Sequence, residues 1–102
     1  MSLLDGRSAE ERKSVPLYRG FMLYFPDAMC AVAELSYKAS KQHGHAEMHW
    51  EKNKSSDHVD CMLRHLLQAE EMDTDGVLHA TKVAWRAMAN LQVTLDRIKA
   101  NE

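Results

Sequence analysis

The chain of 102 residues is long enough for one small domain with a single core, and too short for two. Its formal net charge of −2 excludes a strongly basic protein that would be attracted in bulk to nucleic acid or to an anionic membrane. No apolar run approaches the roughly 20 residues that span a bilayer, and the N-terminal segment lacks the apolar core of an export signal. With Cys30 and Cys61 interpreted as reduced thiols, the sequence predicts a cytoplasmic protein.

The first quarter of the chain contains two contrasting segments. Residues 1–14 are charged and lack periodicity, which predicts a flexible tail. Residues 15–25 are dense in aromatic and bulky apolar side chains and are interrupted by Gly20, a pattern too irregular for a helix. We expect this second segment to be an extended anchor that lies over the core or contributes to a subunit contact. Residues 15–102 are then predicted to form a single all-α domain.

The first main helix is predicted over residues 26–43. Pro26 suits the first helical position, where its missing N–H is harmless, and Asp27 favours the positive end of a helix. Apolar side chains then recur at helical spacing on one side, while Glu34 and Lys38 form an i,i+4 pair on the other. The glycine at position 44 marks the end of this helix.

Two more helices are predicted in the C-terminal half. The second covers residues 56–72, with Ser55 or Ser56 as its N-cap. The third covers residues 76–99, with Thr74 or Asp75 as its N-cap, and its apolar stripe runs through nearly six turns of about 3.6 residues each. Because strand alternation is missing throughout the sequence, the fold class is predicted to be all-α, with three main helices.

Two possible metal sites fail on spacing. His58 and His65 lie about 10 Å apart along a helix, so they cannot both reach one zinc ion that Cys61 also binds, and outside ligands would be needed. Residues 71–76 resemble a calcium loop, but that alignment puts Lys82 where the loop needs a bidentate glutamate. A buried thiol flanked by histidines, and a capped turn, are the simpler interpretations.

A pair of carboxylates on the second helix suits magnesium better. Asp57 and Asp60 lie one turn apart, and all-α nucleotide pyrophosphohydrolases use such i,i+3 pairs from two helices to hold magnesium against a triphosphate. The other pair, Glu70 and Asp73, lies roughly 20 Å further along the same helix and cannot join the first. A magnesium site would therefore combine Asp57 and Asp60 with Glu34 or with a neighbouring subunit. The alternative is a solvated first turn.

Basic and aromatic side chains gather in the loop before the second helix, on that helix and on the third. Arginine and lysine bind phosphate, and tryptophan stacks on a base. Lys82 and Arg86 lie opposite the apolar stripe, so solvated charge is their alternative interpretation, and Trp85 is expected in the core. The predicted phosphate- and nucleotide-binding residues are Trp50, Lys54, Arg64, His79, Lys82 and Arg86.

Several motifs resemble a known family. They are YFPDA at residues 24–28, HW at 49–50, KSSDHVDCMLRH at 54–65 and DTDGVLHATKVAWRA at 73–87. In these motifs the chain is similar to the dATP/dGTP diphosphohydrolase N-terminal domain family, over about residues 15–95. Small proteins of this kind are common in bacteriophages and prophages. The resemblance therefore implies a nucleotide-linked function in phage biology, in the cytoplasm of the host.

These observations predict a small helical protein that binds purine deoxynucleotides or related phosphate ligands. If the protein is an enzyme, water would attack a triphosphate with the help of magnesium. Magnesium would be held by Glu34, Asp57 and Asp60. His49 or His65 would orient or activate the water.

The alternative function is a non-catalytic binding module. Such a module would be a nucleotide sponge, or would bind a host or phage protein. The apolar residues 17–25 also favour an interface, and we expect a homo-oligomer. A helix-turn-helix that binds DNA fits less well, because the net charge is acidic and the third helix is mostly apolar.

Overall fold

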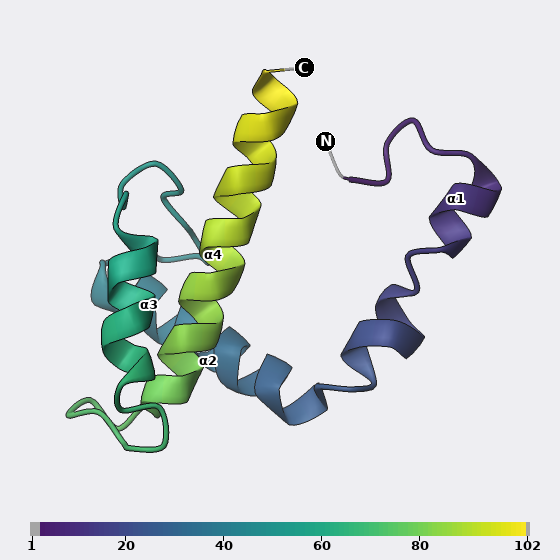
Figure 1. The fold of residues 1–102 in the computed structure, drawn as a ribbon. Coiled ribbons are helices and arrows are strands. Elements are labelled where there is room, and N and C mark those ends of the chain that lie inside the picture. The colour runs from purple at the N-terminus through teal and green to yellow at the C-terminus, as the bar shows by residue number, and fades with distance from the viewer. Residues whose placement is uncertain (1–2, 102) are drawn as a thin grey trace. The chain divides into compact units, whose positions relative to one another are not determined.

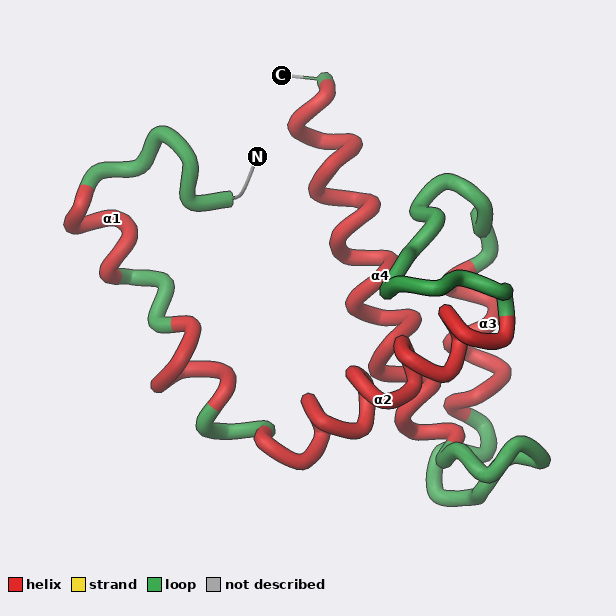
Figure 2. Tube along the Cα trace, turned by 180° about the vertical axis from the view of Figure 1, so that it is seen from behind, coloured by secondary structure: helices red, strands yellow, loops and turns green. Residues whose placement is uncertain are grey.

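The computed structural model describes residues 3–101 and is helical, as predicted (Figure 1). Its elements are α1 (Ala9–Lys13), the π-helical turn η1 (Tyr18–Met22), α2 (Pro26–Gln42), α3 (His58–Leu66) and α4 (His79–Ala100). Within the described residues no strand forms, and the only β-type pairing is an isolated bridge between Met72 and Leu78 (Figure 2). The all-α class is confirmed, although residues 3–101 contain four α-helices and a π-helical turn instead of three main helices alone.

The chain divides into two compact units between Cys30 and Ala31. We refer to them as the N-terminal unit and the C-terminal unit and describe each by itself. None of the helices in the described part of the chain has the length and apolar character that a membrane crossing requires.

The N-terminal unit is more ordered in secondary structure than the sequence suggested. Within the predicted tail, whose residues 1 and 2 lie outside the described part, Ala9–Lys13 form α1. Ser8 caps this helix: its hydroxyl accepts from the backbone N–H of Glu11, while the Glu11 carboxylate accepts from the backbone N–H of Ser8. Such a capping box satisfies two of the unpaired donors at a helix start.

Residues 15–25 are not the extended anchor that was predicted. Tyr18–Met22 form η1, and the backbone N–H of Gly20 donates to the carbonyl of Pro16 at 2.7 Å. A Cβ on Gly20 would lie 2.8 Å from Cγ of Pro16, so glycine lets the proline ring close against the turn. Phe21 and Phe25 then meet edge to face, with ring centroids 5.6 Å apart. Glycine here permits a helical turn, and the prediction treated it as a break.

The C-terminal unit contains the body of the three predicted main helices. α2 ends at Gln42, one residue before its predicted end, whereas α3 is shorter than predicted and α4 begins three residues late. The predicted caps are wrong: Asp57 and Leu78 occupy the N-cap positions, and neither makes a side-chain cap hydrogen bond.

The turn before α4 explains the late start of that helix. Its polar groups bond within the turn: the backbone N–H of Asp73 donates to the carbonyl of Val77 at 2.8 Å, and that of His79 donates to the carbonyl of Glu71 at 3.0 Å. The Asp75 carboxylate accepts from the N–H of Val77, and Gly76 has a positive φ of 82°. The acidic residues therefore close the turn and leave the first turn of the helix uncapped.

The packing of the C-terminal unit depends on few apolar contacts. α3 lies along α4, as Figure 1 shows. Among the described residues, the buried apolar side chains are Cys61 and Ala89, and the buried polar ones are Ser40, His58 and His79. Many large apolar residues of α3 and α4 remain exposed, including Val59, Leu63, Leu66, Met88, Leu91 and Ile98. Polar contacts must therefore supply much of the specificity of this unit.

Candidate functional site

A cavity of about 750 Å³ opens between α2, the loop after it, and α4. Ser36 and Ser40 contribute to its α2 side, and Trp85 and Arg86 to its α4 side. Six of the predicted site residues line it: His49, Trp50, Lys54, His65, Lys82 and Arg86. Residues that were predicted from separate segments thus meet at one hollow, which has the size of an ordinary small-molecule site.

The loop that carries His49 and Trp50 is attached to α2 through a buried serine. The Ser40 hydroxyl donates to the backbone carbonyl of His49 at 3.1 Å and accepts from the backbone N–H of the same residue at 3.2 Å. Lys41 adds a further bond from the end of α2, from its ammonium to the carbonyl of Ala46 at 3.0 Å. These contacts hold an otherwise polar loop against the cavity.

Two tryptophans form an aromatic wall. Trp50 and Trp85 meet edge to face, with ring centroids 5.7 Å apart. The indole N–H of Trp85 donates to the hydroxyl of Ser36 at 2.8 Å, which links α4 to α2. Trp85 was expected in the core, but it is half-buried and lines the cavity, because its polar edge is bound by a serine of the facing helix. The Lys52 ammonium lies 5.6 Å from the centre of the Trp50 ring.

Arg86 lines the cavity, and a buried histidine fixes its orientation. One of its guanidinium nitrogens donates to Nδ1 of the buried His58 at 3.0 Å. Burial first, and then the charge of Arg86, lowers the pKa of His58, so this imidazole is neutral and accepts the bond. The tautomer that accepts at Nδ1 carries its proton on Nε2, which is buried and has no hydrogen-bond partner among the described residues. His58 thus orients Arg86 and leaves its other donors available.

Arg64 does not reach the cavity. Its guanidinium donates to the sulfur of Cys61 at 3.1 Å, and the Cys61 thiol donates to the Asp57 carboxylate at 3.4 Å. This thiol is the main cause of the lowered pKa of Asp57. The thiol is buried, as the sequence indicated. Its two polar contacts are with Arg64, a predicted phosphate ligand, and with Asp57, a predicted magnesium ligand.

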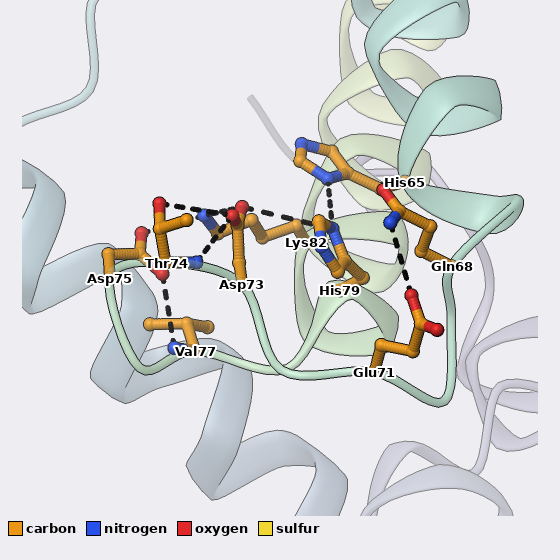
Figure 3. Close-up of polar contacts among 9 residues, drawn as sticks. All are labelled: His65, Gln68, Glu71, Asp73, Thr74, Asp75, Val77, His79 and Lys82. Atoms are coloured by element: carbon orange, nitrogen blue, oxygen red, sulfur yellow. Dashed lines mark hydrogen bonds and ion pairs between the residues drawn. The ribbon is translucent and has the colours of Figure 1, made fainter.

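A second polar network joins α3, the turn before α4, and α4 (Figure 3). Nδ1 of His65 lies 2.8 Å from Nδ1 of His79, and Lys82 bonds both Asp73 and Asp75, at 2.7 and 2.6 Å. The hydrogen bond from Lys82 lowers the pKa of Asp73 to about 2. Burial favours the neutral form of Lys82, but the two carboxylates together outweigh it and raise the pKa of this lysine.

The acidic turn resembles a calcium loop in sequence, and in the structure its carboxylates bind a lysine. The ammonium of Lys82 donates to Asp73 and to Asp75, the two aspartates of that turn. Burial, followed by the charge of Lys82, lowers the pKa of the neighbouring His65. His79 is buried behind His65 and is absent from the cavity lining, so it does not face a ligand there.

The three predicted magnesium ligands do not converge. Glu34 forms an i,i+4 ion pair with Lys38 at 3.8 Å, Asp57 is bonded to Cys61, and Asp60 is exposed. In the described part of the chain, two groups of three potential ligand atoms lie within 4.8 Å of one another, and neither includes these residues. Magnesium binding by these three carboxylates stays a prediction.

The two groups that do form are His45, His49 and Glu51 in the loop, and His65, Asp73 and His79 beside α4. In the first group, a carboxylate oxygen of Glu51 lies 3.7 Å from Nε2 of His45 and 3.8 Å from Nε2 of His49, and all three residues line the cavity. Glu51 was missed in the sequence because a loop offers no periodicity by which to place side chains. Ser40 was missed although it lies in α2, because its role depends on a hydrogen bond to the loop backbone that the sequence does not show. The i,i+4 spacing of His45 and His49 was the available signal.

The comparisons with known proteins support the family suggested by the motifs. A family model described as dATP/dGTP diphosphohydrolase, N-terminal, matches residues 7–102. The chain therefore belongs to this family, which confirms the resemblance and links the protein broadly to nucleotide hydrolases. Searches of curated proteins and of solved structures find no match.

Proposed function

We propose that this member of the dATP/dGTP diphosphohydrolase N-terminal family binds a purine deoxynucleotide, or a related phosphate ligand, in the cavity of its C-terminal unit. The observation that carries the proposal is the meeting of Trp50, Lys54 and Arg86 around one cavity. Tryptophan offers a face for a base, and the two cations suit phosphates.

The contacts of each cation suggest how they divide the work. Arg86 donates one hydrogen bond to His58, which fixes the orientation of its guanidinium group. Because His58 is neutral, it does not cancel the positive charge that Arg86 offers to a phosphate. Lys54 is exposed at the rim, whereas Lys82 is already bonded to two carboxylates. Arg86 and Lys54 are therefore the main phosphate ligands in this proposal, with Lys82 as a secondary charge. Arg64 and His79 do not line the cavity, so in this proposal they would act on the ligand only indirectly.

Hydrolysis is the finer part of the proposal. His49 and His65 both line the cavity, where either could orient or activate a water molecule against a bound triphosphate, releasing pyrophosphate. Magnesium is the proposed cofactor, because it neutralises triphosphates and is often held by only one or two carboxylates besides the phosphates. Asp57, Asp60 and Glu34 remain the carboxylates proposed to bind this magnesium ion. If the protein is phage-encoded, we propose that it acts in the cytoplasm of the host.

The second candidate is binding without turnover. It is favoured by the separation of Glu34, Asp57 and Asp60, each of which has other surroundings. In that case the protein would be a nucleotide sponge or a module that binds a host or phage protein. The exposed apolar side chains of α3 and α4 also support self-association into a homo-oligomer, which size-exclusion chromatography with light scattering would measure.

Isothermal titration with dATP and dGTP, with and without magnesium, tests the proposal, together with an assay for pyrophosphate. Trp50→Ala should weaken binding by roughly fivefold or more, since a stacked base contributes about 1 to 3 kcal/mol. Arg86→Ala should weaken it by roughly tenfold or more, since a charged hydrogen bond contributes about 1.5 to 3 kcal/mol. Arg97→Ala removes a charge from the exposed end of α4 and serves as the control. Binding with pyrophosphate release would identify an enzyme, binding alone would identify a sponge, and no binding would refute the nucleotide site.

A further inference from the structure

His65, Asp73 and His79 form a group that neither the predicted nucleotide site nor the predicted magnesium site explains. We propose that these three side chains bind a divalent transition-metal ion of the zinc class. The proposal does not depend on nucleotide binding, because the metal is tested alone.

The geometry is close to that of a coordination site. Nδ1 of His65 and Nδ1 of His79 are 2.8 Å apart, and a carboxylate oxygen of Asp73 lies 3.8 Å from Nδ1 of His79. Ligand atoms at the usual distance of about 2.0 to 2.1 Å from a tetrahedral zinc ion lie about 3.3 Å from each other. Each of these two separations would therefore change by about half an ångström on binding, which a rotation of the side chains supplies.

The backbone holds the three residues in place. His65 is in the last turn of α3 and His79 is the first residue of α4, which lie side by side. Asp73 lies in the turn between them, and this turn is closed by the backbone bonds from Asp73 to Val77 and from His79 to Glu71. A site whose ligands are fixed by a closed turn loses little conformational entropy when the ion binds.

The burial of the site favours a metal that prefers nitrogen ligands. His79 is only 7% exposed, His65 is half-buried, and the Asp73 side chain is 22% exposed. Two imidazoles and one carboxylate suit zinc, cobalt or iron(II), whereas magnesium and calcium prefer oxygen. Of the three residues, His65 also lines the cavity.

Lys82 is the internal competitor for this site. Its ammonium bonds the same Asp73 oxygen at 2.7 Å, but it has a second carboxylate partner in Asp75 at 2.6 Å. The lysine can therefore give up Asp73 to an ion and keep an ion pair. Replacing it by Lys82→Met should leave Asp73 to the metal alone and tighten binding by roughly tenfold, which corresponds to the removal of one competing charged hydrogen bond.

The test is titration of the full chain with Zn²⁺, followed by Co²⁺, whose absorption spectrum reports tetrahedral nitrogen and oxygen ligands. A Cys30→Ser background removes the exposed thiol, which could bind zinc by itself. We expect one equivalent to bind, and we expect His65→Ala, Asp73→Asn and His79→Asn each to weaken it by more than about tenfold, since even outer-shell partners have effects of that size. His45→Ala, which disrupts the other histidine group, should bind normally.

Two results would overturn the assignment. One is that the wild-type protein binds no zinc, or that the three ligand variants bind zinc as tightly as the wild type does. The other is binding that is lost in His45→Ala, or that fails to tighten in Lys82→Met. Because His79 is buried, circular dichroism must show that His79→Asn is folded. If it is not, His65→Ala and Asp73→Asn decide the question.

Discussion

The bond between Ser40 and the loop that carries Trp50 gives the most direct test of how the cavity is held. Ser40 is 3% exposed and bonds both the N–H and the carbonyl of His49. Removing the hydroxyl in Ser40→Ala deletes two hydrogen bonds of about 1 kcal/mol each. Alanine recovers about 0.5 kcal/mol in helix propensity, because Ser40 lies within α2. The expected loss in the free energy of unfolding is therefore about 1.5 kcal/mol.

Urea unfolding followed by circular dichroism measures this loss, and the combined fluorescence of Trp50 and Trp85 reports on the contact between the loop and α4. The loosened loop should also weaken nucleotide binding, since Trp50 would no longer be held at the wall. Ser55→Ala removes a hydroxyl from the same cavity and leaves both bonds to His49 in place, so it should change stability by less than about 0.5 kcal/mol. An equal effect of the two substitutions would refute the reasoning.

Two further predictions concern the turn before α4 and the N-terminal unit. Asp73 has a folded pKa of about 2, below its ordinary 3.8, so the stability from its bond with Lys82 is complete above pH 3.8 and is lost as the pH falls towards 2. Asp73→Asn should remove this part of the pH dependence in urea unfolding, and an unchanged profile would contradict it. Gly20→Ala should open η1, since its Cβ would lie 2.8 Å from Pro16, and make residues 15–25 more sensitive to limited proteolysis. Adding Pro16→Ala should restore resistance; if it does not, the clash is not the cause.

The helices were predictable where apolar periodicity and a start signal coincide. Pro26 and the residues after it gave α2 to within one residue. The starts of α3 and α4 were misplaced because Ser55, Ser56, Thr74 and Asp75 are good cap residues by type, and the structure uses other contacts there. In the turn before α4, the carboxylates accept hydrogen bonds from turn N–H groups and from Lys82, which lies in the first turn of the next helix.

The cavity was predictable in its chemistry, whereas its geometry was not. Residue type alone identified Trp50, Lys54 and Arg86, since tryptophan can stack on a base and lysine and arginine can bind phosphate. Their meeting depends on the bond between Ser40 and His49, which lie 9 positions apart, and on the bond between Trp85 and Ser36, which lie 49 positions apart. Neither bond leaves a local pattern in the sequence. Trp85 was assigned to the core for the same reason, because helical position shows the side of a residue but not what covers it.

The small apolar core makes these polar contacts more important than they would be in a larger domain. With Cys61 and Ala89 as the buried apolar residues of the described chain, burial alone stabilises the C-terminal unit only weakly. A ligand or metal that binds only the folded state adds stability in proportion to the logarithm of its concentration over its dissociation constant, which is about 2.7 kcal/mol at 100-fold excess. Either bound partner would therefore have a large effect on the thermal unfolding of this unit. Melting curves with zinc and with dATP, measured separately, would show which of the two sites supplies that stability.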